Sequence, residues 1–211
     1  MLVREIMHTD PTTIRTDVSL QDAYAVMQER RIRHLPVVAD DGKVVGVVTD
    51  RDLRLATSAL ATQPFPPGAR VEEVMTRPVQ TADPLDPVEV AARTMRELRI
   101  GCLPVVDDDR LIGIVTGIDL LDAMLRLTGV YKPSGRLEVA VADRPGELAR
   151  LTTLLGSRQV NIQSILSYPG PGGDDTIRIV LRIASIDPRP LAEALCRSGF
   201  EVVWPPHVTC R

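Results

Sequence analysis

The chain has 211 residues and a formal net charge of −3, a length that suits one to three small domains. It has no basic run and only 3% aromatic residues, which argues against nucleic acid or an anionic membrane as its main partner. Three scattered cysteines (Cys102, Cys196 and Cys210) are typical of a reducing compartment rather than a disulfide framework. With no signal-peptide core and no apolar run of about 20 residues, we expect a cytoplasmic protein outside the membrane.

The first 62 residues predict five elements in the order β-α-β-β-α. Apolar residues at helical spacing follow two candidate N-caps, Asp17 and Ser19, and β-branched runs mark the strands. The expected elements are a strand over 12–15, an amphipathic helix from Leu20 onward, strands over 35–39 and 44–48 joined by a turn at 40–42, and a helix from Asp50 to about Thr62.

The junction between the last strand and the last helix carries the sequence Thr49-Asp50-Arg51-Asp52. Thr49 with Asp52 three residues later is a helix-capping pattern. The same helix N-terminus also presents free backbone N–H groups to an anion. A hydroxyl at Thr49 suits phosphate, Asp52 can accept from two ribose hydroxyls, and Arg51 can neutralise phosphate charge. A single copy would favour a plain cap, but the pattern recurs.

The unit repeats at an offset of 66 to 68 residues, with Thr116 and Asp119 in place of the first pair. We divide this part of the chain into a first repeat at 1–62, a linker at 63–69 rich in proline, and a second repeat at 70–128. The second repeat predicts an early strand over 79–81 and an N-cap at Asp83 or Asp86. A pair of units buries far more core than one unit of about 60 residues.

The two repeats, each with a Leu-Pro-Val-Val strand, resemble a tandem pair of CBS domains, a Bateman module. The resemblance implies a cleft between the repeats for AMP, ADP or ATP, with S-adenosylmethionine as another ligand of the class. It implies that each cleft takes its Thr and Asp from one repeat and further contacts from the other. One cleft would hold Thr49, Arg51, Asp52, Thr76, Val79, Gln80, Gly101 and Cys102. The other would hold Thr116, Asp119, His8, Thr12, Thr13 and His34.

The two predicted clefts are unequal, because the second motif reads Thr-Gly-Ile-Asp and lacks a cation between its markers. His8 stands where the second repeat has Thr76. We therefore expect His8 and His34 to supply donors in the Asp119 cleft, or else to be plain surface positions. The sequence leaves open whether one cleft binds or both do.

A third domain is expected over 136–211, after a linker at 129–135 that contains helix-stopping Gly and Pro. Its pattern predicts the order β-α-β-β-α-β, a ferredoxin-like arrangement. Asp143 is a candidate helix cap, and Pro145 suits the first helical turn. The expected elements are strands over 136–141, 160–166, 177–183 and 200–204, a helix with Pro145 in its first turn that ends at about 156–159, and a helix over 190–198.

The turn Asp-Arg-Pro-Gly-x-Leu, with Asn161 fifteen residues after its Gly146, resembles that of an ACT domain. That resemblance implies pairing of two copies through their sheets and an amino acid bound at the interface. The implied contacts are the backbone of Arg144, Pro145, Gly146, Glu147 and Leu148 and the side chain of Asn161. A glycine at 146 lets a carboxylate approach the helix N-terminus, although many ACT domains serve only to dimerise.

The sequence therefore predicts an α+β protein that senses an adenosine nucleotide, forms a homodimer and signals to an unidentified partner protein. The order of domains resembles the acetoin-utilisation CBS–ACT family, whose name records a pathway context rather than an activity. We find no catalytic motif, no metal site beyond the half-site His207 and Cys210, and no cofactor requirement. The alternative is an oligomerisation adaptor with vestigial clefts.

Overall fold

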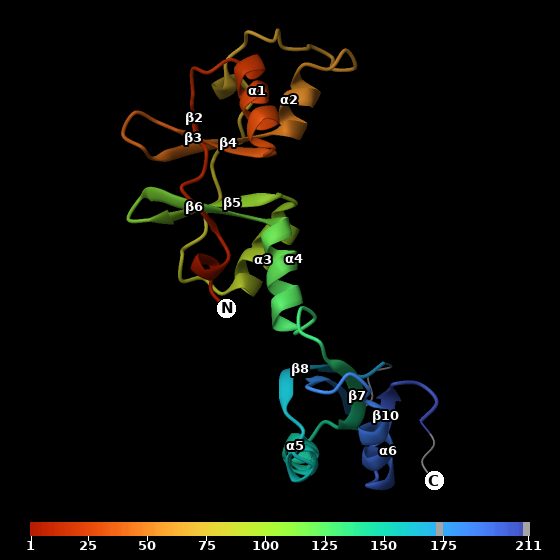
Figure 1. Cartoon of the computed structure of the whole chain (residues 1–211). Coiled ribbons are helices and arrows are strands. Elements are labelled where there is room, and N and C mark those ends of the chain that lie inside the picture. Colours follow the sequence, from red (N-terminus) through yellow and green to blue (C-terminus); the bar gives the residue numbers. More distant parts are fainter. Residues whose placement is uncertain (172–174, 209–211) are drawn as a thin grey trace. The chain divides into compact units, whose positions relative to one another are not determined.

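The computed structural model describes residues 1–171 and 175–208, and the chain divides into two compact units, Met1–Ala123 and Met124–Arg211. The first unit contains two similar halves, each a three-stranded sheet with two α-helices (Figure 1). Its elements are η1 (Val3–Glu5), β1 (His8–Thr9), β2 (Ile14–Arg15), α1 (Leu20–Arg30), β3 (His34–Val38), β4 (Val44–Thr49), α2 (Asp50–Ala56), η2 (Val71–Glu73), α3 (Val88–Leu98), β5 (Cys102–Asp107), β6 (Arg110–Thr116) and the first part of α4 (Gly117–Leu127), whose last turn belongs to the second unit.

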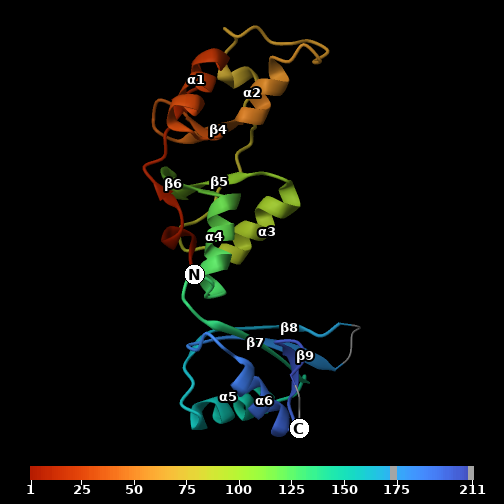
Figure 2. The ribbon, with the colours of Figure 1, turned by 45° about the vertical axis from the view of Figure 1, so that its right-hand side comes forward.

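The two sheets of this unit face each other, and the helices lie on their outer sides (Figure 2). One sheet has the order β2-β3-β4 and the other β1-β6-β5. The sequence of helix α1 explains where it begins and which face it buries. Ser19 caps the helix by accepting from the Asp22 N–H at 3.0 Å, and Leu20, Ala23 and Met27 are buried on one face. This confirms the Ser19 cap and the amphipathic helix that the sequence predicted.

Each half is completed by the segment that precedes the other half. Strand β1 pairs with β6, so that His8 lies opposite Ile114. In the first half, Thr76 and Val47 exchange two backbone hydrogen bonds of 2.9 and 3.2 Å. The hydrophobic cores show the same exchange, because Val3 packs in the second core and Val71 in the first. The repeats are therefore interlocked.

The second unit contains a four-stranded antiparallel sheet with the order β10-β7-β9-β8, covered on one face by two helices (Figure 2). Leucine and isoleucine side chains of the sheet and helices form its core. This confirms the ferredoxin-like order. The elements are β7 (Gly135–Ala142), α5 (Glu147–Ser157), β8 (Ile162–Pro169), β9 (Thr176–Ile183), α6 (Arg189–Arg197) and β10 (Glu201–Trp204).

Four local predictions in the repeats were wrong. Helix α2 ends at Ala56 rather than near Thr62, because the Ala56 carbonyl accepts from the Phe65 N–H in the proline-rich segment. The early strand of the first repeat covers only Ile14–Arg15. No strand forms over 79–81, and a single bridge joins the next residue, Ala82, to Val105. Helix α3 starts after Pro87 without a side-chain cap.

Two predictions in the second unit also fail. Asp143 does not cap α5, since the N-cap is Gly146 at φ +95, a left-handed conformation that glycine adopts without strain. Cys196 is disulfide-bonded, contrary to the expectation of a chain without disulfides, while Cys102 is a free buried thiol. Cys210 of the suggested half-site lies outside the described residues.

Among the described helices, none is long and apolar enough to span a membrane.

We expect Leu151→Ala to destabilise the second unit by about 2–5 kcal/mol, the usual cost of truncating a fully buried leucine. Leu151 is 0% exposed on α5. Leu148→Ala on the same helix is the matched control, because Leu148 is 48% exposed and its truncation should change stability by less than about 0.5 kcal/mol. Urea unfolding followed by the fluorescence of Trp204, the one tryptophan in the chain, measures both. Equal effects of the two variants would contradict the assigned core.

Candidate functional site

The centre of the candidate site is the start of helix α2. Asp52 Oδ2 accepts from the Thr49 N–H at 2.9 Å and from Thr49 Oγ1 at 2.7 Å, and the Asp52 N–H donates back to Thr49 Oγ1 at 3.2 Å. This is the capping box that the sequence predicted. Within the described residues, Asp52 Oδ1 accepts no hydrogen bond. The cap thus orients a carboxylate and leaves one of its oxygens available.

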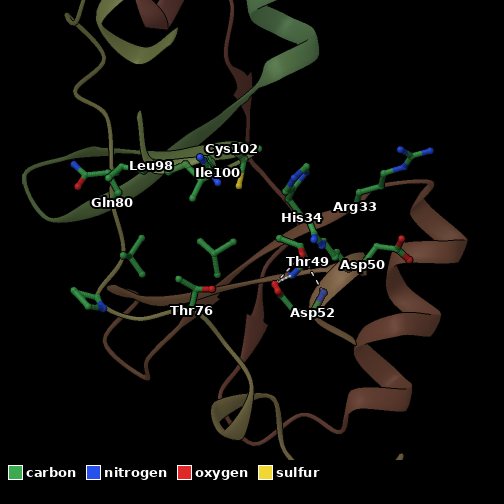
Figure 3. A pocket seen from close by; sticks show the side chains of 16 residues that line it. Arg33, His34, Thr49, Asp50, Asp52, Thr76, Gln80, Leu98, Ile100 and Cys102 are labelled. Atoms are coloured by element: carbon green, nitrogen blue, oxygen red, sulfur yellow. Dashed lines mark hydrogen bonds between the residues drawn. The ribbon is translucent and has the colours of Figure 1, made fainter. Parts of the chain in front are cut away.

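Asp52 faces a cavity of about 940 Å³ between the two repeats (Figure 3). All eight residues predicted for the Asp52 cleft line this one cavity, so the structure brings the predicted set together. Their roles in binding stay predictions. The complete lining is Arg33, His34, Val47, Thr49, Asp50, Arg51, Asp52, Thr76, Pro78, Val79, Gln80, Leu98, Arg99, Ile100, Gly101 and Cys102.

His34 lies in the Asp52 cavity, although we had grouped it with Asp119. A Cβ atom added at Gly101 would stand 2.7 Å from His34 Nε2, so the imidazole fills the space that a side chain at 101 would need. Register explains the placement: His34 pairs with Thr49, as Cys102 pairs with Thr116. His34 therefore lies beside Thr49 of its own repeat, a placement that the repeat alignment did not indicate.

Burial shifts the pKa values of two residues in the cavity wall, His34 and Cys102. It lowers the pKa of His34, an effect that the Asp52 charge partly offsets and the Arg33 charge reinforces. It also raises the pKa of the Cys102 thiol to about 12, and nearby Asp52 adds to that rise. At neutral pH both groups are uncharged, and Cys102 is not a thiolate nucleophile.

Cations outnumber free anions around the cavity. Arg33, Arg51 and Arg99 are exposed side chains of the lining, and none of them makes an ion pair with another described residue. Asp50 is held by Arg54 at 2.9 Å. Arg33 lies at the outer edge of the cavity, with its guanidinium directed away from the centre (Figure 3). An entering anion would therefore meet uncompensated positive charge.

The second Thr–Asp pair keeps the same internal bonds. Asp119 Oδ2 accepts from the Thr116 N–H and Oγ1, both at 2.7 Å. Asp119 is 8% exposed, and its Oδ1 lies 2.9 Å from His8 Nε2, so the predicted proximity of His8 is present. Thr12 is half-buried and Thr13 exposed, and among the described residues neither side chain bonds to Asp119.

The predicted site of the second unit surrounds the start of α5. Glu147 is 7% exposed and is held on one oxygen by Arg144 and on the other by Arg150. These hydrogen bonds lower its pKa. A Cβ at Gly146 would meet nothing within 4 Å, so the approach to this turn is open. Pro145, Leu148 and Asn161 are exposed, and no described hydrogen bond joins Asn161 to the turn.

Family models match the chain in three places: the CBS domain at residues 3–58 and 71–126, and the ACT domain at residues 135–197. The chain belongs to the CBS-domain family. It carries two CBS domains followed by an ACT domain, both of which are regulatory domains. The α+β fold and the family that the sequence indicated are thereby confirmed.

Curated relatives match the CBS pair. A CBS domain-containing protein from Dictyostelium discoideum is 37% identical over 63% of this chain and 97% of its own length. A homoserine O-acetyltransferase from Methanohalobium evestigatum is 40% identical over 56% of this chain, but the match covers only 23% of that enzyme. The chain therefore spans about a quarter of the length of this enzyme.

Solved CBS pairs include complexes with adenosine compounds. One, in complex with 5′-methylthioadenosine and S-adenosyl-L-methionine, is 35% identical over 63% of this chain and 98% of its own, with a TM-score of 0.53. A second, in complex with AMP, is 30% identical over 59% of this chain and 96% of its own length, with a TM-score of 0.52. A Vibrio cholerae protein named for acetoin utilisation is 33% identical over 63% of this chain and 98% of its own length, with a TM-score of 0.52.

We expect the CBS pair to lose stability as the pH falls below about 6.5, the ordinary pKa of histidine. The lowered pKa of folded His34 means that the unfolded chain binds a proton in this range before the folded chain does, so acid favours unfolding. Thermal unfolding between pH 5 and 8, followed by circular dichroism, measures the slope. His34→Gln should flatten it, whereas the control His207→Gln in the other unit should not. Identical slopes for wild type and His34→Gln would contradict this reading.

Proposed function

We propose that this protein is a non-catalytic sensor that binds a phosphorylated adenosine compound in the Asp52 cavity. The observation that carries the proposal is the oriented carboxylate of Asp52, with a free Oδ1 in a cavity of about 940 Å³. A carboxylate with an available oxygen is a suitable acceptor for the vicinal hydroxyls of a ribose. AMP and S-adenosylmethionine complexes of similar CBS pairs support the ligand class.

Charge favours a nucleotide over S-adenosylmethionine, whose sulfonium is a cation. Residues 1–123 contain 14 lysines and arginines against 20 aspartates and glutamates, so this unit is acidic as a whole. The cavity departs from that balance, because Arg51 and Arg99 line it without ion-pair partners among the described residues. Guanidinium groups suit phosphate oxygens. Unpaired arginines at the cavity of an otherwise acidic unit therefore favour an anionic ligand.

We further propose that the ligand state passes to a partner protein and that the chain forms a homodimer. CBS and ACT domains are regulatory domains, and a ligand changes an equilibrium only if it prefers one of the states. An amino acid at an ACT dimer interface is a second proposed input. It is supported by the open approach to Gly146, where Glu147 is held aside by its two arginines.

We expect Asp52→Asn to weaken AMP, ADP and ATP binding by roughly 10- to 100-fold, because hydrogen bonds to a charged group contribute about 1.5–3 kcal/mol. Isothermal titration calorimetry measures the affinity. The matched control is Asp22→Asn, which alters the carboxylate in the Ser19 cap of α1, outside the cavity. If no adenosine compound binds the wild-type chain, the sensor proposal fails and the oligomerisation adaptor becomes the better account.

We expect Arg51→Gln to weaken ATP by about 5- to 10-fold and 5′-methylthioadenosine by less than twofold, because only ATP presents phosphate to the lost charge. ATP affinity should also fall as salt is raised. Arg30→Gln on α1 is the control, since Arg30 is exposed, makes no ion pair with a described residue and does not line the cavity. Tighter binding of S-adenosylmethionine than of any nucleotide would contradict the proposed ligand class.

A further inference from the structure

The helices of the ACT domain cover only one face of its sheet (Figure 2). Leu181 of β9 enters the core on that side. Successive strand residues point to opposite faces, so Val180 belongs to the other side, together with its register partners Glu138 on β7 and Leu166 on β8. We call this side the open face. Leu166 is 40% exposed there, and Trp204, the partner of Glu138 on β10, is 44% exposed.

Glu138 lies near the centre of the open face, and its charge is compensated within the chain. The residue is only 7% exposed. Its Oε1 accepts from the Tyr168 hydroxyl at 2.6 Å, and its Oε2 accepts from Arg136 Nη2 at 2.5 Å. The Arg136 guanidinium also lies over the Trp204 ring, 5.7 Å from its centroid. Both carboxylate oxygens are engaged, so Glu138 does not balance a further cation.

Two arginines of β9 are not compensated in this way. Arg178 and Arg182 lie on the open face with Val180 between them. Arg182 makes no side-chain hydrogen bond or ion pair with a described residue, and it stands directly opposite Arg136, an arrangement of like charges that destabilises a sheet. Arg178 Nη1 is buried without a hydrogen bond, and Glu201 Oε1 lies 3.9 Å away, beyond hydrogen-bond distance. Both guanidinium groups therefore have donors that the chain does not use.

These charges distinguish a second copy of the chain from a different partner. If two copies packed open face to open face, the same surface would be presented from both sides. Arginines would then approach arginines, and the enclosed Glu138 of each copy would not compensate them. Like charges across an interface are unfavourable, whereas complementary charges favour association. Tryptophan, tyrosine and arginine, which the open face presents together, are the residue types that contribute most to protein interfaces. The open face therefore suits a protein that carries carboxylates.

The spacing of the two arginines indicates the form of that partner. Four residues of extended strand separate Arg178 from Arg182 by about 13 Å. In an extended partner segment, residues i, i+2 and i+4 point to one side, so acids at i and i+4 match the two arginines. An apolar side chain at i+2 would lie over Val180, beside Leu166.

We propose that the open face is a docking surface for an acidic protein segment in extended conformation, with the pattern acid-x-apolar-x-acid aligned with β9. Its carboxylates would bind Arg178 and Arg182 in charge-assisted hydrogen bonds. This inference goes beyond the proposed function, because it assigns the chemistry of a protein partner and does not depend on the Asp52 cavity.

The probe is the synthetic peptide Glu-Thr-Leu-Thr-Glu with blocked ends, titrated against the whole chain without nucleotide. The readout is the fluorescence of Trp204, the one tryptophan of the chain, which lies on the same face. Two control peptides keep the length. Gln-Thr-Leu-Thr-Gln removes the charges, and Glu-Glu-Thr-Thr-Leu keeps the composition but changes the spacing. Each control should bind at least about tenfold more weakly, because charge-assisted hydrogen bonds are lost.

Variants of the chain locate the peptide on the open face. Arg178→Gln and Arg182→Gln should each weaken the acidic peptide by about tenfold, and Arg182→Lys, which keeps the charge, should retain more of the binding. Arg158→Gln is the matched control, since Arg158 is exposed at the end of α5 and makes no ion pair with a described residue. Circular dichroism shows whether each variant remains folded.

Several results would overturn the proposal. One is equal binding of the three peptides, and another is no change in Trp204 fluorescence up to millimolar peptide. A third is undiminished binding by folded Arg178→Gln and Arg182→Gln chains. Sedimentation velocity of Leu166→Arg tests the other occupant: if this added cation converts a dimer to a monomer, a second copy covers the open face and the proposal is wrong.

AMP titrations of the same variants distinguish this proposal from the sensor proposal. None of the substituted residues lines the Asp52 cavity, so AMP affinity should not change. If AMP binds and the acidic peptide does not, the sensor stands and the docking surface falls. If the peptide binds as expected to a chain that binds no adenosine compound, the docking surface stands and the sensor falls.

Discussion

The exchange of segments between the two repeats is the constraint on which the rest of the first unit depends. Thr76 pairs with Val47, and His8 pairs with Ile114, so each repeat closes the sheet of the other. These backbone bonds fix a residue from one repeat beside the Thr–Asp pair of the other. The cavity is therefore a product of the interlocking, and neither repeat alone could form its walls.

Helix capping and ligand recognition use the same atoms at Asp52. One carboxylate oxygen satisfies the N–H and hydroxyl of Thr49, as helix N-termini require. The other faces the cavity and is proposed to receive the ribose. The acceptor is thus oriented before any ligand arrives, and binding does not have to include the entropic cost of ordering it. Asp119 has the same orientation, but His8 engages its outer oxygen.

Charged side chains at the candidate sites are paired within the chain in one unit and left without partners in the other. In the ACT domain, Glu147 is enclosed by Arg144 and Arg150, so the charge is compensated within the chain. Around the cavity of the CBS pair, Arg51 and Arg99 have no such partner among the described residues. A compensated charge maintains structure, whereas an uncompensated cluster is available to a ligand. This contrast supports placing the nucleotide in the CBS pair.

The sequence by itself determined the duplication, the capping box at Thr49 and the ferredoxin-like order, because short-range periodicity and repeat spacing encode them. The set of residues around Asp52 was implied by the resemblance to CBS pairs. The sequence did not reveal that α2 ends at Ala56, because a hydrogen bond from the Phe65 N–H to the Ala56 carbonyl fixes that boundary. Nor could it assign His34 to one cleft or show that His8 engages Asp119. Those outcomes depend on how two repeats interlock, and a spacing in one chain does not specify which side chain reaches across an interface.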